Sequence, residues 1–158
     1  MYQRGLKSGF TLVEILLVVA AIAILAGVVI VAINPLKQLA ETRNAQRYSD
    51  VDAILEAVFQ YTIDNGELPD QIDGNAGVVQ VLGTATGGCD SVCGAKISSS
   101  ACLDLSYALE PDYLVDMPVD PKTGSASISD YYIDKTSTDR IEVGACDPER
   151  SVTIKATR

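Results

Sequence analysis

The hydropathy pattern separates an apolar segment near the start of the chain from a more polar remainder. Residues 10–33 contain one charged side chain, Glu14, in an otherwise almost entirely apolar stretch. As a helix rising about 1.5 Å per residue, this stretch is long enough to cross a hydrocarbon core of roughly 30 Å. We therefore predict a membrane-spanning helix over residues 10–35.

A second helical pattern, which is amphipathic, covers residues 36–65. Asn65-Gly66 supplies its C-terminal stop. Its apolar face is formed by side chains at helical spacing, among them Val51, Ile54, Leu55 and Val58. We expect this face to carry a globular head and the charged side chains of the other face to lie mostly in solvent.

The two helical patterns meet at a proline. Pro35 removes one backbone hydrogen bond and crowds the preceding turn, so we predict a kink there. Gly27 and Pro35 bracket a stretch with two open interpretations: it adjusts the curvature of the helix, or it extends during assembly or under load.

Residues 66–158 form the predicted head. Composition rich in Gly, Ser, Asp and Ala predicts a long surface connection over 70–101, with one short element near 78–82. A short helical piece is expected within 103–114. Alternating apolar and polar positions then predict an antiparallel meander, with strands at 128–134, 140–145 and 152–157.

The expected fold class is therefore α+β. A long N-terminal helix, half transmembrane and half amphipathic, packs on a small antiparallel sheet. The predicted divisions are residues 1–9, a leader; 10–35, the apolar helix; 36–65, its amphipathic half; and 66–158, the head.

Composition excludes several kinds of chemistry. The 158 residues include 12 Lys+Arg, 21 Asp+Glu and no histidine, and the formal net charge is −9. Histidine triads and histidine-ligated metals are therefore excluded, and sequence-independent nucleic-acid binding by the isolated subunit is not expected. We find no catalytic candidate, and we expect no enzyme activity, no metal and no cofactor.

The spacing of the acidic residues in the head does not match a metal-binding motif. Asp112, Asp116, Asp120 and the stretch around 130–134 are close in sequence, but their spacing does not match a calcium-binding EF-hand. We interpret them as a solvated acidic surface.

The charges around the apolar segment indicate its orientation. Only nine residues precede it, and they contain Arg4 and Lys7 and no acid, which places the N-terminus in the cytoplasm. Glu14 is costly inside an apolar helix, by roughly 2.5–3.5 kcal/mol. Either it lies near the interface, or it needs a cationic partner, which cleavage between Gly9 and Phe10 would create as a new α-amino group.

The sequence Lys7-Ser8-Gly9-Phe10-Thr11-Leu12-Val13-Glu14, followed by an apolar run, resembles the class III signal of type IV pilins and type II secretion pseudopilins. The resemblance is closest over residues 1–65. It implies cleavage after Gly9 by a membrane-embedded prepilin peptidase, N-methylation of Phe10, and assembly into a helical filament through Phe10, Glu14 and the apolar helices. In such a filament, Arg43 and Arg47 could meet acids on neighbouring subunits.

Four cysteines, Cys89, Cys93, Cys102 and Cys146, lie in the part of the chain predicted to be outside the cytoplasm. Disulfides are expected there, and the spacing fits a zinc ribbon poorly. Four cysteines allow three pairings, among which the sequence does not choose. We expect Cys146 to join one of the other three and to link the irregular loop to the sheet.

The resulting hypothesis is a structural subunit of a type IV pilus-like filament. Its partners would be copies of itself, the prepilin peptidase and an inner-membrane pilus or secretion assembly platform. It would lie in the cytoplasmic membrane as a single-pass protein before assembly and in an extracellular filament afterwards. The alternatives are a pseudopilin of a type II secretion system and a monomeric membrane-anchored binding module that keeps residues 1–9.

Overall fold

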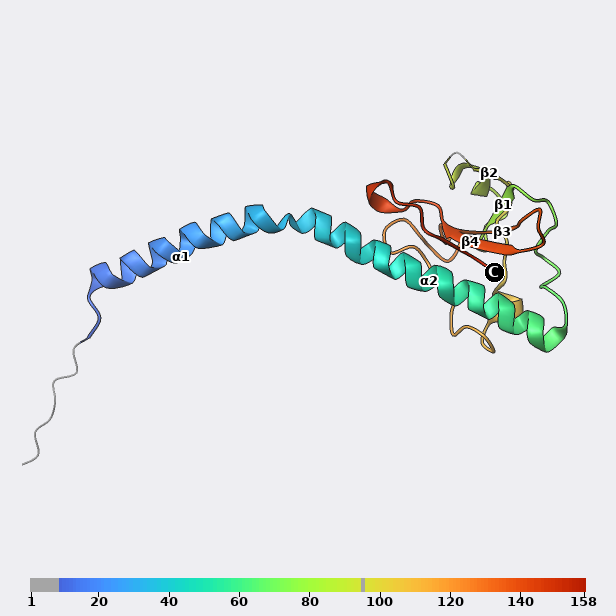
Figure 1. The fold of residues 1–158 in the computed structure, drawn as a ribbon, viewed down its shortest axis with the longest axis horizontal. Coiled ribbons are helices and arrows are strands. Elements are labelled where there is room, and N and C mark those ends of the chain that lie inside the picture. The colour runs from blue at the N-terminus through green and yellow to red at the C-terminus, as the bar shows by residue number, and fades with distance from the viewer. Residues whose placement is uncertain (1–8, 95) are drawn as a thin grey trace, which may run out of the picture. The chain divides into compact units, whose positions relative to one another are not determined.

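A computed structural model describes residues 9–94 and 96–158, so the predicted leader lies outside the described residues except for Gly9. Two compact units divide the chain, Met1–Leu39 and Ala40–Arg158. The helices and strands are α1 (Leu12–Ile33), α2 (Pro35–Asn65), β1 (Val78–Val81), β2 (Ile97–Ser98), α3 (Ser106–Leu109), β3 (Tyr131–Lys135), β4 (Ile141–Ala145) and β5 (Lys155–Thr157), with short 3₁₀ turns at Cys89–Ser91 and Glu149–Ser151 (Figure 1).

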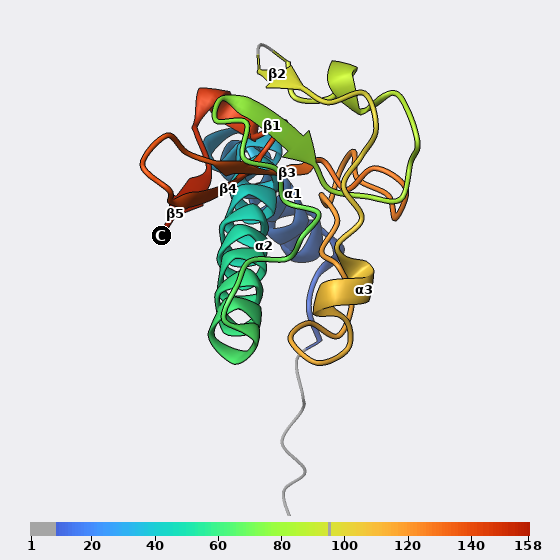
Figure 2. The same ribbon diagram turned by 90° about the vertical axis from the view of Figure 1, so that its right-hand side faces the viewer.

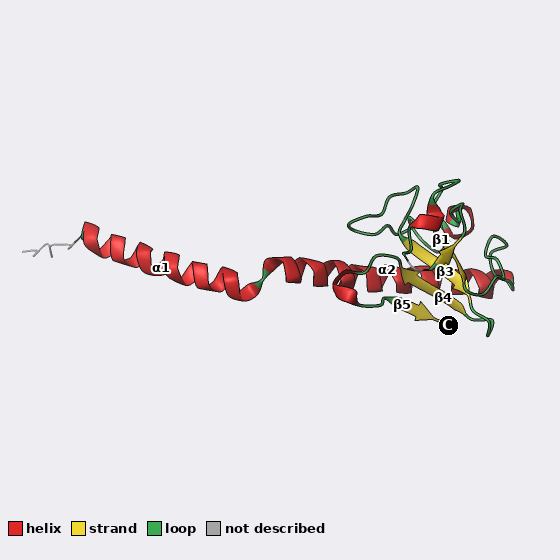
Figure 3. Cartoon of the chain, turned by 90° about the horizontal axis from the view of Figure 1, so that it is seen from above, coloured by secondary structure: helices red, strands yellow, loops and turns green. Residues whose placement is uncertain are grey.

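The predicted long helix is interrupted at Asn34. This residue has a left-handed backbone conformation, with φ 46° and ψ 78°, and it ends α1. Its backbone oxygen and its Oδ1 both accept the amide of Lys37, at 3.0 and 3.3 Å, so it also caps the start of α2. Pro35 occupies the first position of α2, where no amide hydrogen is needed. The disruption expected at Pro35 is thus a break at Asn34 (Figure 3), whereas α1 continues through Gly27.

The sheet of the head has the strand order β2-β1-β3-β4-β5. The predicted antiparallel meander is β3-β4-β5, in which Ile133 pairs with Val143 and Val143 with Ala156. Two further strands extend it, since β1 pairs antiparallel with β3 and the short β2 pairs parallel with β1. The sheet is therefore mixed, and the expectation of a purely antiparallel sheet was wrong for β2.

One face of the sheet packs on α2, as Figure 2 shows for the head. Strand alternation directs Tyr131, Ile133 and Val143 to this face, and all three are fully buried. They join the predicted apolar stripe of α2, which is Val51, Ile54, Leu55 and Val58, together with Ile141, Ala145 and Ile154. The main core therefore lies between α2 and the sheet, as the periodicity of both elements predicts.

The opposite face of the sheet is also covered. Val79, Val81 and Tyr132 form a second buried cluster with Cys89 and Cys93. Val79 and Val81 belong to β1, the short element predicted near 78–82, whereas Cys89 and Cys93 belong to the segment that was expected to be a surface connection. That expectation was wrong for these two residues, because the irregular segment packs on the sheet.

Two disulfides hold this covering segment. Cys89 pairs with Cys102, with Cα atoms 5.4 Å apart, and Cys93 pairs with Cys146, with Cα atoms 4.4 Å apart. The second bond joins the segment to the residue that follows β4, which is the kind of link expected for Cys146. Closing loops of this length stabilises a fold by roughly 3–4 kcal/mol in the chain-entropy account.

The helical piece expected within 103–114 is a single turn, α3. Its Leu109 is fully buried in the main core. Pro111 follows closely, in a cis peptide bond with Glu110, and proline cannot donate the amide that a longer helix would need. The ring of Tyr113 then meets that of Tyr61 edge-on, with 5.8 Å between centroids, so the end of α2 is fixed to this region.

Candidate functional site

The segment that leads into α1 is extended and exposed. Gly9, Phe10 and Thr11 lie outside the helix, and Thr11 is its N-cap. The Oγ1 atom of Thr11 accepts the amide of Glu14 at 3.2 Å. The sequence Thr-x-x-Glu has the spacing of a capping box, which marks the start of a helix. The hydropathy pattern alone does not reveal this start. The helix therefore begins at Leu12, two residues later than predicted.

Glu14 is the acid of the first turn of α1, and its side chain is exposed. A carboxylate is favoured here because the unpaired amides at a helix N-terminus carry partial positive charge. It makes no ion pair with any residue that the structure describes. Among the described residues, Glu14 therefore has a helix terminus beside it but no cationic side chain.

The surface of α1 is apolar on all sides. The helix has 22 residues, none of them buried, and an 18-residue stretch of it has a mean hydropathy of 3.3. It is long and apolar enough to cross a membrane by length and composition. A helix with no polar face needs lipid or other apolar helices around it.

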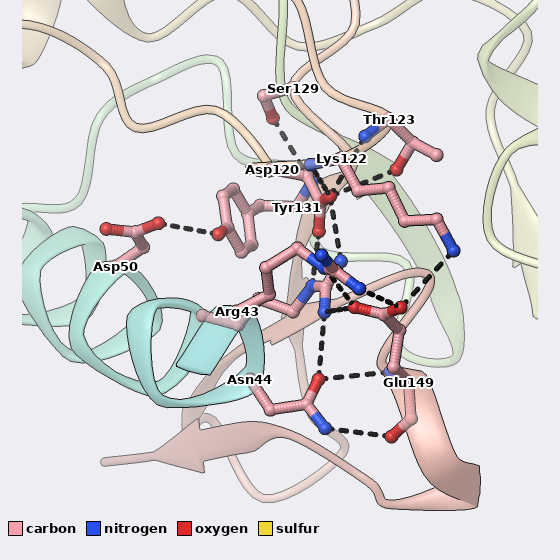
Figure 4. Close-up of polar contacts among 10 residues, drawn as sticks. Arg43, Asn44, Asp50, Asp120, Lys122, Thr123, Ser129, Tyr131 and Glu149 are labelled. Atoms are coloured by element: carbon pink, nitrogen blue, oxygen red, sulfur yellow. Dashed lines mark hydrogen bonds and ion pairs between the residues drawn. The ribbon is translucent and has the colours of Figure 1, made fainter. Parts of the chain in front are cut away.

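A buried polar cluster lies in the head, where α2 meets the loops around Asp120 and Glu149 (Figure 4). We call Arg43, Asn44, Arg47, Asp120 and Glu149 the Arg47 cluster. The side chain of Arg47 is fully buried and binds Asp120 with two parallel hydrogen bonds, Nε to Oδ2 at 2.5 Å and Nη2 to Oδ1 at 2.9 Å. Such bidentate pairs combine strength with fixed geometry.

Asn44 and Arg43 attach the second loop to the same helix. The amide group of Asn44 donates to the backbone oxygen of Glu149 at 2.8 Å, and its oxygen accepts the Glu149 amide at 3.0 Å. Arg43 donates to both oxygens of the Glu149 carboxylate, at 2.5 and 2.7 Å, and Arg47 donates to one at 3.2 Å. The cluster therefore fixes two loops, far apart in sequence, on consecutive turns of α2.

These contacts keep the two carboxylates ionised. Burial raises the pKa of Asp120, but hydrogen bonds from Arg47 and two backbone amides outweigh burial, so the pKa lies below its ordinary value. Hydrogen bonds from Arg43, Arg47 and Lys122 lower the pKa of Glu149 from 4.5 to about 2. The pKa of Arg47 is raised, mainly by its hydrogen bonds to Asp120.

Two other carboxyls of the head shift in the opposite direction. Burial raises the pKa of Asp50, although its Oδ2 accepts the Tyr131 hydroxyl at 2.7 Å. Burial also raises the pKa of Asp130, with a further contribution from the negative charges of Asp147 and Asp120. Both groups therefore favour protonation more than a carboxyl in water does.

The Arg47 cluster corrects two expectations. Arg43 and Arg47 bind acids of their own chain, and Arg47 is fully buried although the charged side chains of this helix were expected to lie mostly in solvent. Asp120 and Asp130 are only 2% and 5% exposed, so the acidic stretch is not a solvated surface throughout. Asn44 and Arg47 precede Val51 at helical spacing, which places them on the buried face of α2. Their position on an otherwise apolar stripe is the feature of the sequence from which their burial could have been predicted.

The fold and the exposed apolar helix together define a protein with an N-terminal segment that fits membrane anchoring and a separate disulfide-linked α+β head. Residues 4–30 match the prokaryotic N-terminal methylation motif, the class III signal peptide of type IV pilins and pseudopilins. This motif indicates a type IV pilin-like or pseudopilin precursor, and the family that carries it is structural. No curated protein and no solved structure matches the chain.

The first prediction concerns the buried ion pair. Arg47→Met leaves Asp120 without its counter-ion, and we expect a loss of about 3–5 kcal/mol in the free energy of unfolding of the head. Urea unfolding of the full chain in detergent, followed by tyrosine circular dichroism, measures it. Arg158→Met is the matched control: its guanidinium pairs with Glu56 at the surface, so the loss should stay within about 1 kcal/mol. Equal losses in the two variants would contradict the assignment.

The second prediction concerns acid stability. The pKa of Glu149 in the folded chain, about 2, lies below its ordinary 4.5, so its contribution is complete above pH 4.5 and disappears as the pH falls toward 2. We expect Glu149→Gln to lower the Tm at pH 7 and the deficit to shrink toward pH 2. Thermal unfolding across this pH range measures the effect. The control is Glu67→Gln, since Glu67 is exposed and lies outside the cluster, and its Tm should equal that of the unmodified chain at each pH. A deficit that stays constant down to pH 2 would show that the carboxylate charge is irrelevant.

Proposed function

We propose that the chain is the precursor of a structural subunit of a type IV pilus-like filament. The observation that carries this proposal is a 22-residue apolar helix without a buried side chain, most of which lies within the matched methylation motif. Such a helix is stable in lipid, and it is equally stable in a bundle of identical helices. Transfer from membrane to filament would therefore preserve its apolar surroundings.

Processing would take place at the junction between Gly9 and Phe10. Both residues are exposed and lie outside α1, so a peptidase could bind this backbone without unwinding a helix. Arg4 and Lys7, with no acid among residues 1–9, favour a cytoplasmic N-terminus, which is the side on which a prepilin peptidase would cut. Methylation of the new terminus at Phe10 would follow.

Cleavage would give Glu14 a cationic partner. Cleavage turns Phe10 into a positively charged terminus four residues before Glu14, at nearly the same membrane depth. In a staggered bundle, the amine of one subunit can lie beside the carboxylate of its neighbour. Because an unpaired charge is costly in an apolar bundle, this pairing would set the axial register between subunits.

Close packing of the helices is compatible with the residues along α1. Ala20, Ala21, Ala23, Ala26 and Gly27 are small enough for helix axes to approach one another. A Cβ atom added at Gly27 would meet no other atom within 4 Å, so the space beside this residue is open to another subunit.

Before assembly, the protein would be a single-pass protein of the cytoplasmic membrane, with its head outside, engaged by a pilus or secretion assembly platform. After assembly it would belong to an extracellular filament on the cell surface. A type II secretion pseudopilus would use the same processing and the same apolar helix, whereas a monomeric binding module would keep its leader.

Mass spectrometry of the protein purified from its own cells tests the processing. We expect the mature chain to begin with N-methylated Phe10 and to lack residues 1–9. Gly9→Ile should block cleavage, because the added branched side chain occupies the position next to the scissile bond. An intact Met1 on surface-exposed, functional protein would refute the proposal and support the anchored module.

Glu14→Ala tests the assembly step. Since the substitution leaves the Phe10 amine without a counter-ion in the apolar bundle, we expect filament yield to fall about tenfold or more while cleavage continues. Glu67→Gln, which removes an exposed charge from the head, is the control and should leave the yield unchanged. Undiminished filament yield from Glu14→Ala would exclude the charge pairing even if the chain still polymerised.

A further inference from the structure

An open pocket of about 320 Å³ lies in the head beside α3. Its apolar part is formed by Leu105, Met117 and Val119, and its acidic part by Asp104, Glu110 and Asp116. Two of the carboxylates are held in place: Asp104 accepts the amide of Ser106 at 3.0 Å, and Glu110 accepts the amide of Met117. The pocket thus combines an apolar wall with fixed negative charge.

The negative charge of this pocket is not balanced locally. From Ile97 to Asp120 the sequence contains five acids and no Lys or Arg. Asp104, Glu110 and Asp116 make no ion pair with any residue in the described ranges. An apolar wall beside unbalanced carboxylates suits a cation on an apolar stem, which is the chemistry of an arginine or lysine side chain.

One arginine of the head has the complementary property. Arg140 lies at the end of the turn between β3 and β4, is exposed, and makes no ion pair with a residue that the structure describes. The other described arginines of the head, Arg43, Arg47, Arg150 and Arg158, each face a carboxylate.

The turn that presents Arg140 is held rigid by its own hydrogen bonds. The backbone oxygen of Arg140 accepts the amide of Thr136 at 2.8 Å, and its amide donates to the Thr136 hydroxyl at 3.1 Å. Lys135 pairs with Asp139 across the same turn at 3.2 Å, which leaves that acid engaged. A preorganised turn loses little conformational freedom when its side chain binds.

The two features lie on different sides of the head. Ile141, next to Arg140, exchanges backbone hydrogen bonds of 2.9 Å with Arg158, so the turn is adjacent to the C-terminus. In Figure 2 the C-terminus lies on one side of α2 and α3 lies on the other. With the turn and the pocket on different sides of the head, the partner of this arginine would be the pocket of a second copy.

We propose that Arg140 of one subunit docks in the pocket formed by Asp104, Glu110 and Asp116 of a neighbouring copy. The contact joins two different surfaces, so it is heterologous, which is the type of contact that an open helical polymer needs between successive subunits. This inference rests on the proposed function, and it adds a specific head-to-head contact to the association of the apolar helices.

A charge exchange in the full chain, expressed in its own cells, tests the contact. We expect Arg140→Glu and Asp116→Arg each to lower filament yield about fivefold or more, because repulsion replaces attraction. The double variant should recover to within about twofold of the unmodified chain. Asp112→Arg is the control: it makes the same charge change as Asp116→Arg at an exposed acid that does not line the pocket, and it should have little effect.

A photo-crosslinking amino acid at position 140 gives a second measurement, in membranes as well as in filaments. We expect adducts to peptides from residues 104–119 of another copy, and none from a probe at position 150. The contact would be overturned if adducts form only to other regions or other proteins. It would also be overturned if the double charge variant does not recover filament yield. A chain with an unprocessed N-terminus and no filament would refute the proposed function, while the cross-link would still decide whether copies meet here.

Discussion

The need to keep the surface of α1 out of water constrains every other part of this protein. The helix exposes large apolar side chains along its whole length, among them Leu12, Val13 and Val31 at 71–83% exposure. Burying one such side chain stabilises it by roughly 1.5–3 kcal/mol, so 22 mostly apolar residues cannot remain in water. None of these side chains is buried within α1, and the buried residues of the two helices begin only at Ala40.

This constraint explains the independence of the two helices. Asn34 ends one helix and caps the next, so each helix has its own satisfied terminus and neither needs the other to fold. The head can therefore form its core from α2 and the sheet alone.

Three kinds of interaction stabilise the head in three places. The apolar core joins α2 to one face of the sheet, the disulfides attach the covering segment to the other face, and the Arg47 cluster fixes two loops on α2. A small head with long irregular segments buries too little apolar surface to rely on the core alone. The ion pair and the disulfides act at the loops, where conformational entropy is largest.

The sequence by itself determined the apolar helix, the amphipathic stripe, the meander and the N-terminal motif, because each follows from periodicity or from residues adjacent in the chain. Tertiary structure alone decided the partners of Arg47, since Asp120 and Glu149 lie 73 and 102 residues away, and any of many acids was available. It also decided that β2 runs parallel to β1 and which cysteines pair. The physical reason is the same throughout: local patterns record which face of an element is buried, but only three-dimensional packing brings specific, distant groups together.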